Sequence, residues 1–144
     1  MLYERAGKED NMDIDFLIAQ AKNAKEYSYS PYSKFRVGAA LLCESGKVYT
    51  GCNIENVAYS PSNCAERTAV FKAVSEGEHR FKAIAVIGDT KDQIAPCGVC
   101  RQVLAEFCNL EDFQIIMANS DGDYKVMRLN ELLPSAFDKE SLDR

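Results

Sequence analysis

The sequence predicts an α/β fold, in which one mixed sheet of five strands carries helices on its faces. Two observations lead to this prediction. Short apolar segments with strand character alternate with segments of helical periodicity, which favours a sheet covered by helices. The first two strands are joined by a hairpin turn, which makes the sheet mixed instead of purely parallel. The length of 144 residues fits a single domain and suffices to bury a core without disulfide bonds.

The first half of the domain is predicted as a helix followed by a β-hairpin. Residues 13–27 form the helix, because apolar side chains recur there at intervals of three and four. Residues 35–43 form the first strand, in which alternate side chains are apolar. The turn at 44–47 leads into a second strand at 48–52. The apolar positions are Ile14, Leu17, Ile18, Ala21 and Ala24 in the helix and Phe35, Val37, Ala39, Leu41 and Cys43 in the strand.

The second half continues the alternation of helices and strands. Its first helix ends at Gly77, a residue type that favours helix C-termini, and its second helix follows Pro96, which suits a first helical turn. The strands are expected at 81–87, 113–118 and 124–127, and the helices at 64–76, 97–108 and 129–133.

The charge balance and the N-terminal segment narrow the classes of function. There are 17 Lys and Arg against 22 Asp and Glu, a net charge of −5, which argues against charge-driven binding of nucleic acid. No apolar run approaches the roughly 18 residues of a membrane span. The first ten residues lack the apolar stretch of a secretory signal. We therefore expect a cytoplasmic protein, whose thiols bind metal or lie in the core instead of forming disulfides.

Six cysteines and a single histidine are the unusual feature of the composition. Two segments, Cys64-Ala65-Glu66 and Pro96-Cys97-Gly98-Val99-Cys100, each begin a predicted helix. Cys97 and Cys100 are three residues apart and share the apolar face of their helix, so their sulfurs should point toward the core. Glu66 lies on the apolar stripe of the other helix, where a carboxylate is costly unless it is paired or used.

Three thiolates at helix N-termini suit zinc, because a helix N-terminus favours the thiolate over the thiol. A structural zinc takes four protein ligands, whereas a catalytic zinc leaves one position for water and lowers the pKa of that water. Glu66 would then accept and return protons beside the water. Three thiolates and Zn²⁺ sum to −1, so Arg67 and Arg101, which each follow a motif, are expected to offset this charge through hydrogen bonds to sulfur.

Three other interpretations of the cysteines remain open from the residues alone. The thiols could be ordinary core residues. A closed structural zinc could use Cys52 or Cys108 as a fourth sulfur, although a second C-x-x-C is missing. A redox C-x-x-C would leave Cys64 and Glu66 unexplained. The cysteines outside the motifs are expected in or near the core: Cys43, Cys52 and Cys108.

The two cysteine segments resemble the zinc signature of the small zinc-dependent cytidine deaminases. Segments 31–40, 51–56 and 131–134 resemble further family segments, in family order. The resemblance covers residues 13–138, which leaves 1–12 as a loose N-terminal extension and 139–144 as a C-terminal tail. It implies a three-layer α/β/α cytidine-deaminase-like fold around the five-stranded sheet.

The resemblance also implies how a nucleoside would be bound. Asn53 and Glu55 match residues that hydrogen-bond the ribose hydroxyls, and Phe35 matches a residue that packs against the nucleoside. The backbone N–H of Ala65 matches a group that reads the pyrimidine edge, together with the catalytic carboxylate. The carbonyl of Ala95 matches an acceptor for the amino group.

The same resemblance implies a homotetramer with shared active sites and one Zn²⁺ per subunit. Tyr59 and Phe137 match positions through which a neighbouring subunit completes the pocket. The implied reaction is hydrolysis of cytidine to uridine and ammonia: hydroxide formed at the zinc attacks C4 while Glu66 protonates N3 and relays a proton to the leaving amine. The ligands of that zinc would be Cys64, Cys97 and Cys100.

The expected function is therefore deamination of free cytidine and 2′-deoxycytidine in pyrimidine salvage. The sequence contains no glycine-rich phosphate loop and no basic stripe, which disfavours phosphorylated substrates and polynucleotide editing. A deaminase for another aminopyrimidine nucleoside is the alternative within enzymes, although Asn53 and Glu55 point away from it. A zinc-stabilised interaction module without turnover is the alternative outside them.

Overall fold

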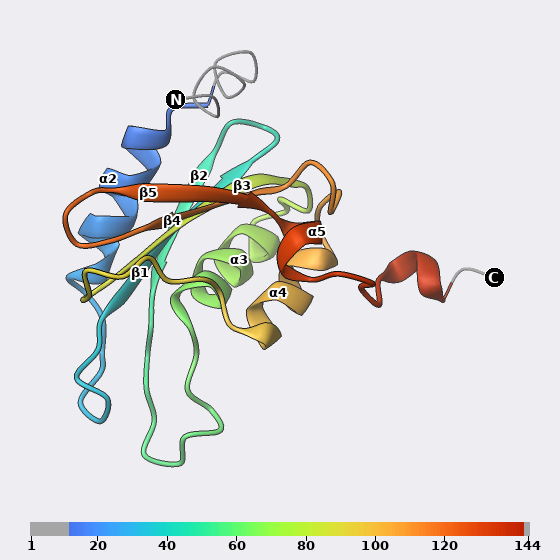
Figure 1. The fold of residues 1–144 in the computed structure, drawn as a ribbon. Coiled ribbons are helices and arrows are strands. Elements are labelled where there is room, and N and C mark those ends of the chain that lie inside the picture. Colours follow the sequence, from blue (N-terminus) through green and yellow to red (C-terminus); the bar gives the residue numbers. More distant parts are fainter. Residues whose placement is uncertain (1–11, 143–144) are drawn as a thin grey trace.

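One five-stranded sheet forms the centre of the computed structural model, which describes residues 12–142. Its strand order is β2-β1-β3-β4-β5 (Figure 1). β1 is antiparallel to both β2 and β3, β3 is parallel to β4, and β4 is antiparallel to β5. The predicted mixed sheet is thus confirmed. The strands are β1 (Val37–Cys43), β2 (Val48–Cys52), β3 (Phe81–Gly88), β4 (Gln114–Ala118) and β5 (Tyr124–Arg128).

Helices cover both faces of the sheet and give it the predicted three layers (Figure 1). α2 (Ile14–Lys25) packs on one face, and α3 (Ala65–Ser75) and α4 (Gly98–Ala105) pack on the other. The strands alternate between the two cores: Leu41 lies with α3 and α4, whereas Ala40 lies with α2. The chain ends in the short helix α5 (Leu129–Leu132) and the 3₁₀ turn η1 (Lys139–Ser141), which projects away from the sheet.

The ends of several elements differ from the prediction. The strand predicted at 35–43 begins at Val37, and the helix predicted at 97–108 ends at Ala105. The helix is shorter because Phe107 turns out of it to pack against Phe81, with ring centroids 5.2 Å apart and ring planes tilted by 41°. Its carbonyl then accepts a hydrogen bond from the Phe81 N–H at 3.0 Å. This tertiary contact replaces the last helical turn.

Of the predicted loose extension 1–12, the structure describes Met12 alone, and residues 1–11 lie outside the described residues. Met12 is buried in the core on the α2 side of the sheet, so this residue belongs to the packed part of the described chain. In the described part of the chain, every helix is too short or too polar to cross a lipid bilayer.

Two close backbone approaches place the helices on the sheet. Gly38 of β1 faces α2 and Gly51 of β2 faces α3, at positions where a side chain would collide with helix backbone. A Cβ on Gly51 would lie 2.5 Å from the Ala65 carbonyl oxygen. The first turn of α3, which carries the Cys-Ala-Glu motif, is therefore seated directly against β2.

Candidate metal centre and active site

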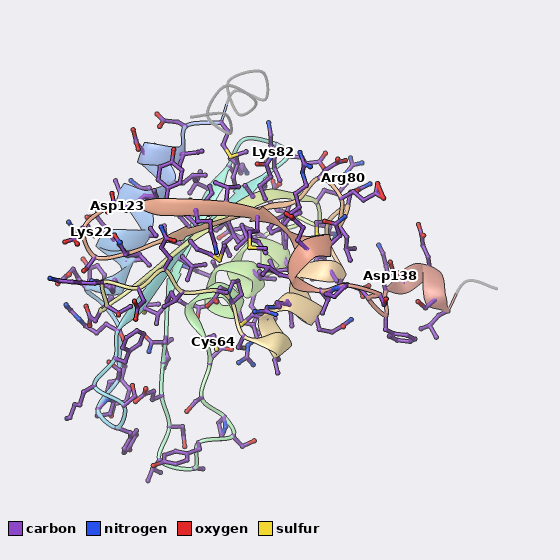
Figure 2. The ribbon with its side chains drawn as sticks, in the orientation of Figure 1. Lys22, Cys64, Arg80, Lys82, Asp123 and Asp138 are labelled. Carbon is purple, nitrogen blue, oxygen red and sulfur yellow. The ribbon has the colours of Figure 1, made fainter. Side chains whose placement is uncertain are left out.

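Three cysteine sulfurs meet where the first turns of α3 and α4 come together. Cys64 is the N-cap of α3, Cys97 is the N-cap of α4, and Cys100 lies in the first turn of α4. The Sγ of Cys97 lies 3.7 Å from that of Cys64 and 3.5 Å from that of Cys100, and all three lie within 4.8 Å of one another. Figure 2 shows Cys64 at this junction. The sulfurs are close enough together for one metal ion to bind all three.

One side of this sulfur cluster is buried and the other faces solvent. Cys100 is fully buried, but Cys97 is exposed, which corrects the expectation that both sulfurs point toward the core. Cys97 caps the helix from outside, and its side chain accepts a hydrogen bond from the Cys100 N–H at 3.5 Å. Within residues 12–142, this is the only group of three or more Cys, His, Asp or Glu side chains close enough to hold a metal.

The composition of this ligand set bears on the alternatives for the cysteines. Cys52 and Cys108 are not members of the cluster, so the described residues give no four-sulfur site. The carboxylate of Glu66 is not a member either. Three sulfurs with one open side match the ligand count of a catalytic zinc instead of a structural one. The soft thiolate donors fit zinc, and the six cysteines are all unpaired.

Hydrogen bonds to Cys64 favour its thiolate form. The thiol of Cys100 and the guanidinium of Arg67 both lower the pKa of Cys64. Arg67 donates from Nη2 to the Sγ of Cys64 at 3.3 Å, as the charge argument predicts. The Nε of Arg67 is buried and has no hydrogen-bond partner in the described structure. The positive charge of Arg67 is therefore held beside the sulfur cluster.

Arg101 is placed differently from the expectation that it bonds to sulfur. It donates from Nε to the Pro96 carbonyl at 2.8 Å and from Nη1 to the Leu132 carbonyl at 2.9 Å. These contacts tie the residue before Cys97 to the end of α5. Arg101 therefore acts on the ligand loop through the backbone.

Glu66 is buried beside the sulfur cluster, in the first turn of α3. It is 4% exposed and shares a face with Ala69, Val70 and Ala73, as its place on the apolar stripe predicts. Burial raises the pKa of Glu66 to about 7. A carboxyl group with a pKa near neutrality can both donate and accept a proton under physiological conditions.

A cavity of about 360 Å³ joins the sulfur cluster to several of the predicted nucleoside-binding residues. Such a volume suits a small-molecule ligand. The lining includes four residues that were not among the predicted site residues, Val37, Ser62, Asn63 and Ile94, of which Asn63 directly precedes the first motif. The residues that line it are Val37, Asn53, Glu55, Ser62, Asn63, Cys64, Ala65, Glu66, Arg67, Ile94, Ala95 and Cys97.

Asn53 fixes the chain at the edge of this cavity. Its Oδ1 accepts a hydrogen bond from the Val37 N–H at 2.9 Å, and its Nδ2 donates to the Phe35 carbonyl at 2.8 Å. A further hydrogen bond comes from the hydroxyl of Ser28. Asn53 therefore holds β1 to the loop that follows β2.

Glu55 holds the neighbouring turn in the same way. Its Oε1 accepts hydrogen bonds from the backbone N–H groups of Tyr32 and Ser33, at 3.0 and 3.1 Å, and its other oxygen accepts one from the Ser33 hydroxyl. These hydrogen bonds lower the pKa of Glu55 and keep it ionised, and the one from the Ser33 hydroxyl has the largest effect on the pKa. It thus presents a fixed anionic group at the cavity.

Three of the predicted nucleoside-binding residues, Phe35, Tyr59 and Phe137, do not line the cavity in this single chain. The ring of Phe35 packs against Gly88, where a Cβ would lie 2.9 Å from its Cζ. Tyr59 is 71% exposed and meets Tyr32 edge-on, with ring centroids 6.2 Å apart, beside an adjoining cavity of about 330 Å³. Phe137 is 59% exposed on the segment after α5.

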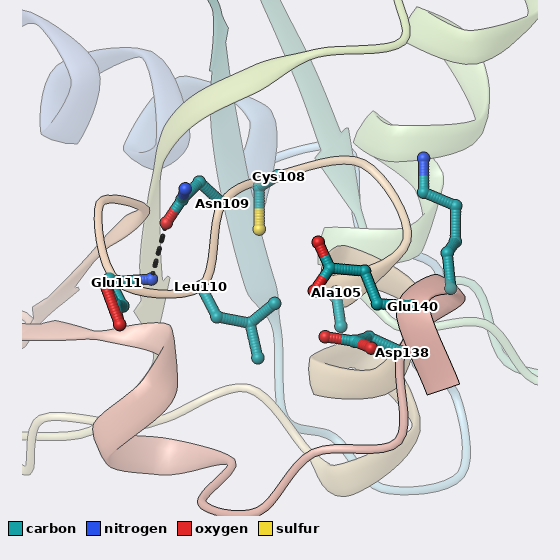
Figure 3. A pocket seen from close by; sticks show the side chains of 8 residues that line it. Ala105, Cys108, Asn109, Leu110, Glu111, Asp138 and Glu140 are labelled. Atoms are coloured by element: carbon teal, nitrogen blue, oxygen red, sulfur yellow. Dashed lines mark hydrogen bonds between the residues drawn. The ribbon is translucent and has the colours of Figure 1, made fainter. Parts of the chain in front are cut away.

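A separate cavity of about 320 Å³ lies between α4 and the C-terminal turn (Figure 3). Cys108 lines it, and burial raises the pKa of this thiol to about 12. The thiol therefore stays protonated near neutral pH and is a poor nucleophile and a poor metal ligand. The side-chain oxygen of Asn109 accepts a hydrogen bond from the Glu111 N–H at 2.9 Å, as Figure 3 shows. The reactive groups described above gather in the first cavity instead.

Comparison with known proteins points to one family. The family described as "Cytidine and deoxycytidylate deaminase zinc-binding region" matches residues 12–117. The chain is 57% identical to the cytidine deaminase of Sporosarcina psychrophila, over 91% of this chain and 96% of that one. It is 51% identical to the cytidine deaminase of Halalkalibacterium halodurans, over 92% of this chain and 99% of that one.

The fold agrees with solved structures of the same name. A crystal structure of cytidine deaminase from Burkholderia pseudomallei superposes with a TM-score of 0.83 at 48% identity, covering 88% of this chain and all of that one. Cytidine deaminase from Mycobacterium tuberculosis gives a TM-score of 0.77 at 40% identity, covering 88% of this chain and 98% of that one.

Proposed function

Because the chain belongs to the zinc-binding family of cytidine and deoxycytidylate deaminases, we propose that it hydrolyses cytidine and 2′-deoxycytidine to uridine and 2′-deoxyuridine, with release of ammonia. The observation that carries this proposal is the meeting of three cysteine sulfurs and a buried carboxyl group at one cavity. The free nucleosides and this reaction fit a cytoplasmic enzyme of pyrimidine salvage. The unpaired state of all six cysteines supports a reducing compartment.

Cys64, Cys97 and Cys100 would hold one Zn²⁺ per chain. Bound zinc would lower the pKa of a water molecule and so supply hydroxide near neutral pH. The hydrogen bond from Arg67 to Cys64 supports this assignment, because it reduces the electron density that the thiolate passes to the metal. Arg101 would hold the Pro96 carbonyl, and with it the loop that carries Cys97.

Glu66 would carry the protons of the reaction. Addition of water across the C4–N3 bond of the pyrimidine requires a proton at N3, and departure of the amine requires a proton on its nitrogen. A single group with a pKa near 7 can move the first proton of water to N3 and then move the proton of the new C4 hydroxyl to the amine. The products are a carbonyl at C4 and ammonia, so that atoms and charge balance.

The residues around the cavity supply groups suited to a nucleoside. We assign the Ala65 N–H and the Ala95 carbonyl to the pyrimidine edge, and Asn53 and Glu55 to the sugar hydroxyls. An ionised Glu55 accepts hydrogen bonds from hydroxyl groups, which supports a sugar over a phosphate at this position. Among the described lining residues, Arg67 is the only cation, and it is bound to Cys64. Phe35 would pack against the nucleoside once it is bound.

A homotetramer with shared active sites completes the proposal. Tyr59 and Phe137 are exposed in the single chain and lie outside its cavity, which fits residues that contact a neighbouring subunit. Phe137 also lies on a segment that leaves the body of the domain after α5 (Figure 1). Sedimentation of the zinc-loaded protein tests this part, and an active monomer would contradict it.

The decisive test is a substrate panel followed by the change in ultraviolet absorbance. It contains cytidine, 2′-deoxycytidine, CMP, dCMP, adenosine and free cytosine. We expect turnover of the first two, with kcat/KM at least about a hundredfold lower for the phosphorylated, purine and base substrates. Turnover of none of them would favour a zinc-stabilised interaction module. A preference for CMP or dCMP would refute the assignment of the sugar site.

A further inference from the structure

We propose that Asp89 is a positioning residue for the nucleoside cavity, because it clamps the chain entering β1 to the chain leaving β3. This inference deepens the proposed function and rests on it for its effect on turnover. The clamp itself is a property of the described contacts.

The Asp89 carboxylate binds two cations from different parts of the chain. Its Oδ1 lies 2.8 Å from Nζ of Lys25, at the C-terminal end of α2. Its Oδ2 lies 2.8 Å from Nε of Arg36, and Nη2 of Arg36 donates to Oδ1 at 3.1 Å. This two-point contact fixes the orientation of the carboxylate as well as its position.

Backbone groups of Asp89 and Arg36 form two further hydrogen bonds between these residues. The Arg36 N–H donates to Oδ2 of Asp89 at 3.1 Å, and the Asp89 N–H donates to the Arg36 carbonyl at 3.1 Å. Lys25 is buried, with 6% of the residue exposed, and Asp89 supplies the ion-pair partner that burial of an ammonium group requires. Two-point geometry and a network of several charges are the conditions under which an ion pair near the surface contributes to structure, so we expect this one to be rigid.

Both segments that the clamp joins lead into the cavity. Arg36 lies between Phe35, the predicted nucleoside contact, and Val37, which lines the cavity. Asp89 begins the loop that carries Ile94 and Ala95 to the cavity and ends at the ligand Cys97.

The ring of Phe35 shows how tightly the two segments meet. It packs on Gly88, the residue before Asp89, and a Cβ on Gly88 would lie 2.8 Å from Ile94 Cδ1 and 2.9 Å from Phe35 Cζ. Asn53 holds the Phe35 carbonyl and the Val37 N–H from the other side. Segment 35–37 is thus held between Asp89 and Asn53, and these hydrogen bonds fix the position of this wall of the cavity.

The clamp predicts an effect on substrate binding that differs from a loss of catalysis. Asp89→Asn keeps the size of the side chain but removes its charge, so that the wall should loosen while the zinc ligands and Glu66 stay in place. We expect KM for cytidine to rise about tenfold, with kcat changed less than about threefold. Arg36→Gln, which removes the other half of the clamp, should have the same effect.

Two control variants separate this role from a general loss of stability. Asp92→Asn makes the same charge change at an exposed site in the same loop and should leave KM unchanged. Ile116→Ala removes buried methyl groups from the α2 side of β4, so it lowers stability without touching the clamp. It should lower the melting temperature and leave KM unchanged at a temperature well below unfolding.

Hydrogen exchange measured by mass spectrometry tests the clamp without any turnover. In the zinc-loaded protein, Asp89→Asn should speed exchange in peptides covering 35–37 and 89–95, and Ile116→Ala should not do so selectively. An unchanged KM, or unchanged exchange in these peptides, would overturn the proposal. If wild-type protein failed to convert cytidine, the proposed function would fall, while the exchange experiment would still decide whether the clamp exists.

Discussion

Arg67 donates a hydrogen bond from Nη2 to the Sγ of Cys64 across 3.3 Å, from one turn further along the same helix. The spacing of three residues places both side chains on one face of α3. The pairing sets a fixed positive charge beside a ligand set that would otherwise leave bound zinc with a net charge of −1. Such an excess of negative charge weakens the metal as an electrophile.

Replacing Arg67 by Gln should therefore weaken both zinc binding and turnover. We expect each to fall about ten- to a hundredfold, the range seen when partners of metal ligands are removed. Competition with a chelator measures the zinc affinity, and kcat/KM for cytidine measures turnover. Arg80→Gln, at an exposed site away from the cavity, is the control. If Arg67→Gln retained zinc and rate like the wild type, the charge argument would be wrong.

Glu66→Gln should separate metal binding from proton transfer. The amide keeps the size of the side chain but cannot exchange protons, so kcat should fall at least about a thousandfold. Zinc content should stay the same, because Glu66 is not part of the ligand group. Metal analysis and an ultraviolet assay on one preparation measure both, with the exposed Glu44→Gln as the control. Retained turnover in Glu66→Gln would contradict the assigned role.

The fold was predictable where periodicity and packing agree. Leu41 alternates with Ala40 along β1, and the structure divides them between the two cores as the pattern requires. The end of α4 was not predictable, because Phe107 leaves a good helical pattern to contact Phe81, which lies 26 positions earlier in the chain. Local sequence does not contain such a contact.

In the site, too, the features set by local sequence were predictable and those set by contacts between distant segments were not. The meeting of the three cysteines followed from two motifs that each begin a helix, and Glu66 followed from a charge on an apolar stripe. The hydrogen bond from Arg101 to the Leu132 carbonyl could not be predicted from the sequence, because Leu132 lies in a distant segment of the chain. The clamp at Asp89 could not be predicted from the sequence either, because its two cations, Lys25 and Arg36, come from α2 and from the segment before β1.

Removing the metal should abolish activity and lower stability together. A chelator-treated protein should show no turnover, and one equivalent of Zn²⁺ per chain should restore it. Saturating zinc at a hundred times its Kd should stabilise the fold by about 2.7 kcal/mol, a shift visible in the melting temperature.

Cys100→Ser should reproduce this loss, whereas Cys108→Ser should retain both zinc and rate. Cys108 is the matched control because its thiol stays protonated and lies outside the cluster. Metal content per chain, measured by plasma mass spectrometry, decides the stoichiometry. Loss of zinc from Cys108→Ser, or two ions per chain, would refute the three-sulfur site.

Gly51→Ala should disturb the site from the far side of α3. The new Cβ would lie 2.5 Å from the Ala65 carbonyl oxygen and 2.6 Å from the Ala69 nitrogen, so the helix must shift. We expect a loss of about 2 kcal/mol in the free energy of unfolding. Because that turn of α3 carries Cys64 and Glu66, kcat/KM should fall as well.

Gly122→Ala is the matched control for this variant. Its φ of +90° makes alanine unfavourable by about 1 kcal/mol, but Gly122 lies in the turn between β4 and β5, which contributes no lining residue to the cavity. Its melting temperature should fall while kcat/KM stays unchanged. Equal effects of the two variants on kcat/KM would show that activity follows stability instead of the position of α3.

Asp89 should also make the stability of the domain depend on pH. Hydrogen bonds from Arg36, and then from Lys25, hold the pKa of Asp89 well below its usual range. A depressed pKa adds stability above the unfolded-state value of about 4, and this stability is lost as the pH falls toward the folded-state value.

At pH 7, Asp89→Asn should lower the free energy of unfolding by about 2 kcal/mol, less than the loss of a fully buried pair because 26% of the Asp89 side chain is exposed. Urea unfolding followed by circular dichroism between pH 3 and 8 should show a constant gap above about pH 5 that narrows below pH 4. With Asp92→Asn as the charge-matched control, a gap that widened toward acid would mean that Asp89 is protonated more readily in the folded protein, the reverse of what its two cations require.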